Sequence, residues 1–112
     1  MTTIYEALAD PTRRDILDLI RERPRLVGEL ADLLEVPQPN VSKHLRVLRK
    51  VGLVHVRREA QWRWYELNPE PLAELRDWLT PYYEQLEARF ARLDQLLESL
   101  QEGDPDEPDS EP

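Results

Sequence analysis

Residues 27–50 read VGELADLLEVPQPNVSKHLRVLRK, and the spacing of the apolar residues in this stretch decides the fold. From Val27 to Leu34 the apolar residues recur at helical intervals, and Glu35-Val36-Pro37 then turns the chain. A second helical pattern begins near Pro39 and continues to the end of the stretch. Two helices joined by a turn of about four residues are typical of a helix-turn-helix, so this motif organises the predicted fold.

The second of these helices presents a polar face. Val41, Leu45 and Leu48 are spaced four and three residues apart, so they share an inward face. Asn and Gln bond adenine through two hydrogen bonds, Lys and Arg do the same with guanine, and a helix N-terminus favours phosphate. The sequence therefore predicts a recognition helix for the major groove of duplex DNA, with a merely solvated polar face as the alternative. Its candidate DNA-binding residues are Gln38, Pro39, Asn40, Ser42, Lys43, His44, Arg46 and Arg49.

Extended segments follow the helix-turn-helix. The runs Leu53–Arg58 and Trp62–Leu67 are rich in β-branched and aromatic residues, which predicts a β-hairpin with Tyr65 and Leu67 facing the core. The tip of the hairpin, Glu59–Gln61, contains no glycine, so we expect a longer loop built on a type I turn. A basic hairpin beside a recognition helix is a wing that reaches the DNA backbone. Its candidate DNA-binding residues are Arg57, Arg58, Gln61 and Arg63.

Two further helices are predicted upstream of this motif. The apolar residues between Ile4 and Leu8 form one side of a short helix. Asp10-Pro11, an N-cap followed by proline, starts a second helix that runs to about Arg23. Residues 1–68 are therefore predicted to form a winged helix-turn-helix DNA-binding domain, in a chain that is mainly α with a small β-hairpin and a long C-terminal helix.

Leucine recurs every seven residues in the C-terminal half of the chain. This heptad pattern predicts dimerisation helices over residues 69–102, with Thr80-Pro81 as a kink or as the start of a new helix. A small domain cannot bury so long a helix internally, so a symmetric partner chain is the simplest cover, and the domain's own core is the alternative. The heptad leucines are Leu72, Leu79, Leu86, Leu93 and Leu100, with Leu75, Tyr82 and Leu96 between them.

The charge of the chain is unevenly distributed. The net charge of -8 argues against nucleic acid, but Met1–Leu67 carries 12 Lys or Arg against 10 Asp or Glu, whereas Asn68–Pro112 carries 3 against 13. A local basic surface in the first part therefore remains compatible with DNA binding. Residues 103–112 are acidic, rich in proline and free of large apolar residues, so we expect a disordered tail there.

Composition argues against several other classes of protein. Cysteine is absent, which excludes a disulfide framework and a cysteine nucleophile. No apolar stretch approaches the roughly 20 residues that a membrane span needs, and no export signal precedes the first helix, so we expect a soluble cytoplasmic protein. The chain has two histidines and neither a phosphate loop nor a serine elbow, so we expect no enzyme activity.

Three segments carry a family resemblance: Ala7–Arg14 with Ile16-Leu17, Gly28–Ala31 with Gln38–Leu45, and Leu48–Val54 with the wing. In this order and spacing they resemble the arsenical-resistance-repressor (ArsR/SmtB) family of winged-helix transcription regulators. The resemblance implies a homodimer whose first and last helices pack together. It also implies that the two recognition helices enter neighbouring major grooves of a near-palindromic operator, usually to repress transcription. The dimerisation residues would be Ile4, Tyr5, Leu8, Leu79, Tyr82, Leu86, Phe90 and Leu93.

The sequence departs from the metal-sensing members of that family. Those members often carry a Cys-x-Cys pair before an acidic residue of the third helix, where this chain reads Leu26-Val27-Gly28. Others bind zinc through Asp, His and Glu on the last helix, and this chain has no histidine beyond His55. We therefore expect no metal site and no cofactor. The family commonly has a histidine at the position of His44, which we interpret as a packing or phosphate-contact residue.

Two other functions remain open at this point. A protein-interaction module of the antitoxin or adaptor kind would use the acidic C-terminal helix and bind DNA only secondarily. A small-molecule-responsive regulator would hold its effector between the core and the region of Trp78, Tyr82, Tyr83 and Phe90, although aromatic residues at helical spacing are usually packing. The preferred prediction is a homodimeric repressor that binds double-stranded DNA at a specific sequence.

Overall fold

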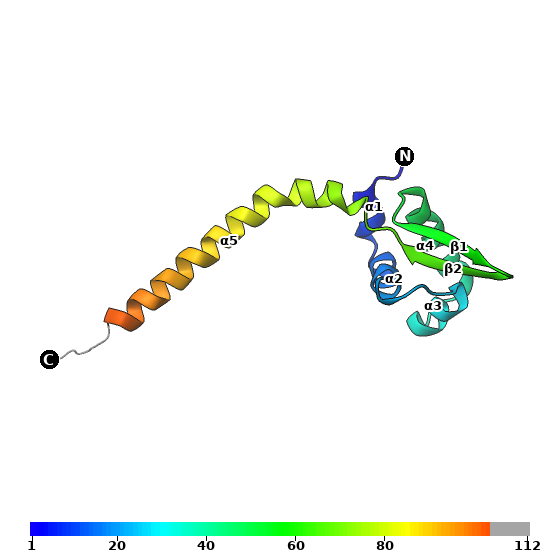
Figure 1. Cartoon of the computed structure of the whole chain (residues 1–112), viewed down its shortest axis with the longest axis horizontal. Coiled ribbons are helices and arrows are strands. Elements are labelled where there is room, and N and C mark those ends of the chain that lie inside the picture. Colours follow the sequence, from blue (N-terminus) through cyan, green and yellow to red (C-terminus); the bar gives the residue numbers. More distant parts are fainter. Residues whose placement is uncertain (104–112) are drawn as a thin grey trace. The chain divides into compact units, whose positions relative to one another are not determined.

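The computed structural model describes residues 1–103 as a mainly helical chain with one small hairpin (Figure 1), which confirms the predicted fold class. The chain divides into two compact units, Met1–Arg76 and Asp77–Pro112. The elements in chain order are α1 (Ile4–Ala9), α2 (Pro11–Glu22), α3 (Val27–Leu34), α4 (Gln38–Lys50), β1 (Val54–Glu59), β2 (Trp62–Leu67) and α5 (Leu72–Gly103).

Short-range hydrogen bonds explain where the first helices begin. The Thr3 hydroxyl accepts from the Glu6 backbone N–H at 3.2 Å, while the Glu6 carboxylate accepts from the Thr3 backbone N–H at 2.8 Å. This reciprocal pair satisfies two donors that the start of α1 leaves free. At the start of α2, the Asp10 side chain accepts from the N–H groups of Thr12 and Arg13, and Pro11 follows it. The cap and proline predicted for α2 are thus confirmed.

One apolar core holds the first unit together. The inward positions predicted for the recognition helix, Val41, Leu45 and Leu48, are all buried in it. Tyr65 and Leu67 of the hairpin pack against the same core, as the sequence predicts. The other buried members come from α1, α2, α3 and the start of the hairpin: Ile4, Ala7, Ile16, Ile20, Leu30, Leu53 and Val54.

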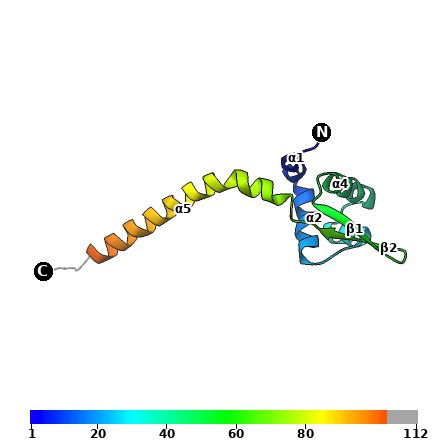
Figure 2. The same ribbon diagram turned by 45° about the horizontal axis from the view of Figure 1, so that its top comes forward.

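The hairpin is tighter than its sequence predicts. The strands pair antiparallel from Val54 opposite Leu67 to Glu59 opposite Trp62, which leaves two residues in the turn. The predicted longer loop is therefore wrong. Ala60 takes a φ of 55°, a left-handed conformation that glycine usually supplies in a two-residue turn. The hairpin projects beyond the helices of its unit in both views (Figures 1 and 2).

The C-terminal segment is one helix. α5 runs from Leu72 to Gly103 with Pro81 inside it, so Pro81 does not start a new helix. Gly103, where the sequence predicts the start of a tail, is the last residue of α5, and residues 104–112 of that predicted tail lie outside the described residues. The heptad leucines from Leu79 to Leu100 are exposed within residues 77–101.

Candidate nucleic-acid interface

The turn between α3 and α4 aims the start of the recognition helix. α3 ends at Leu34, the C-cap residue Glu35 reverses the chain with a φ of 55°, and Pro37 then stands at the N-cap of α4. The Pro37 carbonyl oxygen accepts from the N–H groups of Asn40 and Val41 at 2.9 and 3.2 Å. Pro39 has no N–H, so the first turn of α4 offers a DNA phosphate fewer backbone donors than an ordinary helix start. DNA contact here must therefore depend mainly on side chains.

The side chains of α4 divide as the sequence predicts. Its apolar face is buried, and its polar face is open to solvent along the helix. Ser42 and His44 are half-buried at the boundary between the two faces. The exposed residues are Gln38, Pro39, Asn40, Lys43, Arg46 and Arg49, together with Lys50, which the sequence analysis missed. Lys50 follows Arg46 by four residues, a spacing that places both on one side of the helix and could have revealed it.

The hairpin adds a second set of exposed side chains. Arg57, Arg58, Gln61 and Arg63 all lie on the surface. Arg58 and Arg63 are direct partners across the two strands, so two like charges are placed side by side. Such a pair is destabilising in isolation, and a polyanion bound beside it would relieve the repulsion.

Arg57 differs from its neighbours because it is already paired within the hairpin. Its Nε donates to Glu66 Oε2 at 2.8 Å, and its Nη1 lies 3.6 Å from Glu59 Oε1. His55 Nε2 lies 2.9 Å from the other oxygen of Glu66. The hydrogen bond from Arg57 is the main cause that lowers the pKa of Glu66. Arg57 therefore offers DNA less free charge than the sequence predicts.

The basic residues of the first unit fall into a paired and an unpaired set. Arg23 and Arg25 are in ion pairs with Glu29 and Glu22, far from the polar face of α4 in the sequence. Six cations without an ion-pair partner among the described residues lie on α4 and the hairpin: Lys43, Arg46, Arg49, Lys50, Arg58 and Arg63. We name these six residues the open cations. Outside this set, the exposed cations without an ion-pair partner among the described residues are Arg14 and Arg21 of α2 and Arg89 and Arg92 of α5.

His44 is a predicted site residue that contacts a side chain of another helix. Its Nδ1 lies 3.4 Å from Nη1 of Arg13, which belongs to α2. Arg13 is not among the predicted site residues, because His44 lies 31 residues away from it along the chain. The same guanidinium also donates to two backbone carbonyl oxygens of α1.

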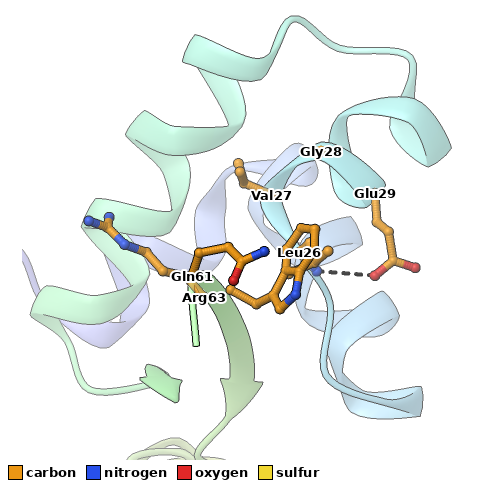
Figure 3. Close-up of a pocket in the computed structure, with 7 residues that line it drawn as sticks. Leu26, Val27, Gly28, Glu29, Gln61 and Arg63 are labelled. Carbon is orange, nitrogen blue, oxygen red and sulfur yellow. Dashed lines mark hydrogen bonds between the residues drawn. The ribbon is translucent and has the colours of Figure 1, made fainter. Parts of the chain in front are cut away.

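A pocket of about 400 Å³ lies between the start of α3 and the hairpin tip (Figure 3). Its walls are residues 26–29 on one side and residues 61–63 on the other. The Glu29 carboxylate accepts from the Leu26 backbone N–H at 3.1 Å and is bonded to Arg23. The bond from Arg23 is the first cause that lowers the pKa of Glu29, so this carboxylate already has hydrogen-bond partners within the protein.

Across residues 1–103 no three His, Cys, Asp or Glu side chains are grouped so as to hold a metal ion.

The residues that the family resemblance assigns to a dimer surface differ in their exposure to solvent. Ile4 is only 5% exposed and belongs to the core of its own unit, so it is removed from the dimer surface. Leu8 is partly buried against that core, and Tyr5 is 39% exposed. The α5 members are all more than 40% exposed: Leu79, Tyr82, Leu86, Phe90 and Leu93.

In the described part of the chain, no helix has the length and apolar character that crossing a bilayer requires.

Comparisons with known proteins agree on one family. A family of sequences described as a helix-turn-helix domain matches residues 8–57. The chain is 32% identical to the transcriptional repressor SdpR of Bacillus subtilis over 70% of this chain and 88% of that protein. It is 42% identical to the HTH-type transcriptional regulator Rv2034 of Mycobacterium tuberculosis over 80% of this chain and 83% of that protein.

Solved structures give the same result. The crystal structure of the ArsR family transcriptional regulator RHA00566 has a TM-score of 0.65 and 32% identity, with 75% of this chain and 92% of that chain covered. The homodimeric winged helix-turn-helix DNA-binding domain Mb0332 of Mycobacterium bovis, a solution structure, has a TM-score of 0.57 and 30% identity. That comparison covers 71% of this chain and 74% of the other.

Proposed function

Because this chain belongs to the ArsR family of winged helix-turn-helix transcriptional regulators, we propose that it binds a near-palindromic operator as a homodimer and represses transcription there. The observation that carries the proposal is the concentration of the open cations on α4 and the hairpin. Since unpaired cations near phosphates release counterions from DNA, this surface supplies the non-specific part of the affinity. Repression is inferred from relatives such as SdpR, which is named a transcriptional repressor.

Side chains at the start of α4 supply the sequence-specific part. Asn40 and Lys43 are exposed on this helix, next to the turn from α3. Asn pairs with adenine through two hydrogen bonds, and Lys donates to the acceptors of guanine. Arg58 and Arg63 of the hairpin bind the phosphate backbone beside the groove. α4 thus reads bases, while the hairpin fixes the position of the protein on the duplex.

A second copy of the chain supplies the other half of the operator contact. The heptad leucines of α5 from Leu79 to Leu100 repeat every seven residues and are exposed, as in helices that pair with another helix. Leu8 lines an apolar groove of about 350 Å³ in the first unit, which adds apolar surface on the α1 side. The solved relative Mb0332 is described as homodimeric, which supports the same assembly here. We place the protein in the cytoplasm and assign it no enzyme activity, in keeping with a family of DNA-binding regulators.

Replacement of single residues tests the division of roles. We expect Asn40→Ala and Lys43→Ala each to lose about 1–3 kcal/mol of affinity for the operator, because a base contact with two hydrogen bonds is lost. On random duplex, Asn40→Ala keeps its affinity, whereas Lys43→Ala, which also removes an open cation, loses less affinity than it loses on the operator. Gln95→Ala, which alters an exposed amide of α5, is the matched control and binds like the wild type. Equal losses on operator and random duplex would contradict base reading by α4.

A further inference from the structure

Two neighbouring arginines donate hydrogen bonds to the C-terminal end of α1. The last four carbonyl groups of a helix have no partner within the helix, and in α1 they belong to residues 6–9. Arg13 and Arg14 of α2 donate to all four of them. Arg13 bonds the oxygens of Glu6 and Ala7 at 3.0 and 2.7 Å, and Arg14 bonds those of Leu8 and Ala9 at 2.7 and 3.1 Å. The two arginines therefore have matched roles toward α1.

Only Arg13 also reaches the recognition helix. Its Nη1 lies 3.4 Å from His44 Nδ1 and 4.0 Å from Asp10 Oδ2. Its Nε and Nη2 are occupied by α1, so all three nitrogen atoms of the guanidinium have a partner. The Arg13 side chain is 17% exposed, which shields these contacts from competing water. One side chain thus joins α1, the start of α2 and the DNA-reading helix.

The contact determines which nitrogen of His44 carries the proton. A guanidinium has donors and no acceptor, so His44 Nδ1 must be the acceptor. A neutral imidazole that accepts at Nδ1 is protonated at Nε2. The opposite tautomer would place two N–H groups against each other. Arg13 therefore selects a ring whose second nitrogen is a hydrogen-bond donor.

Asp10 keeps Arg13 in this position. Burial acts to raise the pKa of Asp10, but the backbone N–H groups of Arg13 and Thr12 and the charge of Arg13 act against it, and the pKa is lowered. The carboxylate therefore stays charged beside the guanidinium. A charged Asp10 and two carbonyl oxygens leave Arg13 little freedom to turn away from His44.

We propose that Arg13 is a positioning residue for DNA reading, which fixes His44 as the tautomer that donates through Nε2 to an oxygen or nitrogen acceptor on the operator. This inference rests on the proposed function, because it assumes that α4 binds operator DNA. His44 lies between the exposed Lys43 and Arg46 on the same helix, in the segment that contacts DNA. DNA phosphates and most base edges of the major groove are acceptors, so a donor at this position attracts DNA and an acceptor repels it.

The first test reads the tautomer without DNA. ¹⁵N spectra of the histidine rings are recorded for the full-length wild type, Arg13→Ala and Arg14→Ala, at a pH where histidine is neutral. We expect His44 to be the Nε2–H form in the wild type and in Arg14→Ala, and a mixture of both forms in Arg13→Ala. Arg14→Ala removes as many carbonyl bonds as Arg13→Ala, so it controls for damage to α1. An Nδ1–H form in the wild type, or an unchanged ring in Arg13→Ala, would overturn the proposal.

The second test measures operator affinity in a double-mutant cycle. We expect Arg13→Ala to weaken operator binding about tenfold and Arg14→Ala less than about threefold, since one donor to DNA is lost only in the former. The amide nitrogen of His44→Gln replaces Nε2 and needs no tautomer, so in that background Arg13→Ala should have no further effect. Equal losses for the two arginine variants, or the same loss in the His44→Gln background, would overturn the positioning role. If the wild type bound no DNA sequence more tightly than random duplex, the proposed function would be overturned instead. The ring spectra would still show which tautomer His44 adopts.

Discussion

Arg57 and Arg58 are adjacent on one strand, yet they have different charge environments. Arg57 is bonded to Glu66 and lies near Glu59, whereas Arg58 faces Arg63. A cation that already has an acidic partner contributes less to the release of counterions from DNA. We expect Arg58→Ala to lower the salt slope of DNA binding by about one, and Arg57→Ala to lower it less. Affinities over a series of salt concentrations measure both slopes, and equal slopes would contradict the role of Glu66.

Ala60 carries the backbone strain of the hairpin turn. Its φ of 55° is left-handed, which is unfavourable for a residue with a Cβ atom. We expect Ala60→Gly to raise the free energy of unfolding by about 1 kcal/mol, as measured by urea denaturation. Gln61 is not among the residues of positive φ, so Gln61→Gly should be destabilising. The opposite order of the two variants would show that the turn has another conformation.

Arg25 is a buried cation that the sequence analysis did not single out. It is 8% exposed, donates to the Leu19 carbonyl oxygen at 3.2 Å and to Glu22 at 2.9 Å, and lies 3.8 Å from Glu29. Its backbone also bonds to that of Tyr65, so this residue links α2, α3 and β2. We expect Arg25→Ala to lower the free energy of unfolding by about 2 kcal/mol.

The control for that variant is Arg21→Ala. Arg21 is exposed on α2, four residues before Arg25, and has no ion-pair partner among the described residues, so its removal should change stability by less than about 0.5 kcal/mol. Thermal or urea denaturation compares the two. A similar small effect for both would mean that the contacts of Arg25 add no net stability.

At the scale of whole elements, local sequence rules locate the helices well. Asp10 and Pro11 start α2, and Gly52 follows α4 with a φ of 83°, the left-handed position typical after a helix. The hairpin turn is different, because the packing of Tyr65 and Leu67 on the core fixes the strand register. That register leaves only two residues for the turn, so Ala60 adopts an unfavourable positive φ.

The candidate site is predictable only in part, for a related reason. Exposure along α4 follows from the spacing of its buried residues, so the sequence places Asn40 and Lys43 correctly on the open face. Pairing of side chains depends on tertiary contacts instead. Arg57 meets Glu66 through the strand register, and Arg13 meets His44 across a separation of 31 residues. Such partners cannot be read from periodicity or composition.

Glu29 makes the start of α3 sensitive to acid. Its pKa is lowered, first by the hydrogen bond from Arg23 and next by the Leu26 backbone N–H. A carboxyl with a lowered folded-state pKa stabilises the protein above its ordinary value of 4.5, and this stability is lost as the pH falls through the folded-state pKa. We expect Glu29→Gln to reduce the fall in unfolding free energy below about pH 4.5.

Asp32→Asn is the matched control for this acid effect. Asp32 is an exposed carboxylate of the same helix with no ion-pair partner among residues 1–103. Its variant should keep the pH dependence of the wild type when unfolding is measured from neutral to acid pH. The same reduction in both variants would remove the special role of Glu29.

At the scale of the whole molecule, function depends on a second chain. Leu86 is 43% exposed on α5 and is one of the heptad leucines. We expect Leu86→Glu to weaken dimerisation at least about tenfold, because a charge would be placed in an apolar helix-helix seam. Sedimentation measures the change, and Gln95→Glu is the control at an outward position of the same helix. An unchanged mass for Leu86→Glu would exclude this seam as the dimer contact.

Selection of bound sequences from a pool of random duplexes tests whether two copies of α4 bind one operator. If two copies of α4 enter neighbouring major grooves, the selected DNA contains two inverted half-sites with centres about 10 base pairs apart. Bound complexes then contain two protein chains per duplex. No enriched sequence, or a single half-site bound by one chain, would contradict the account.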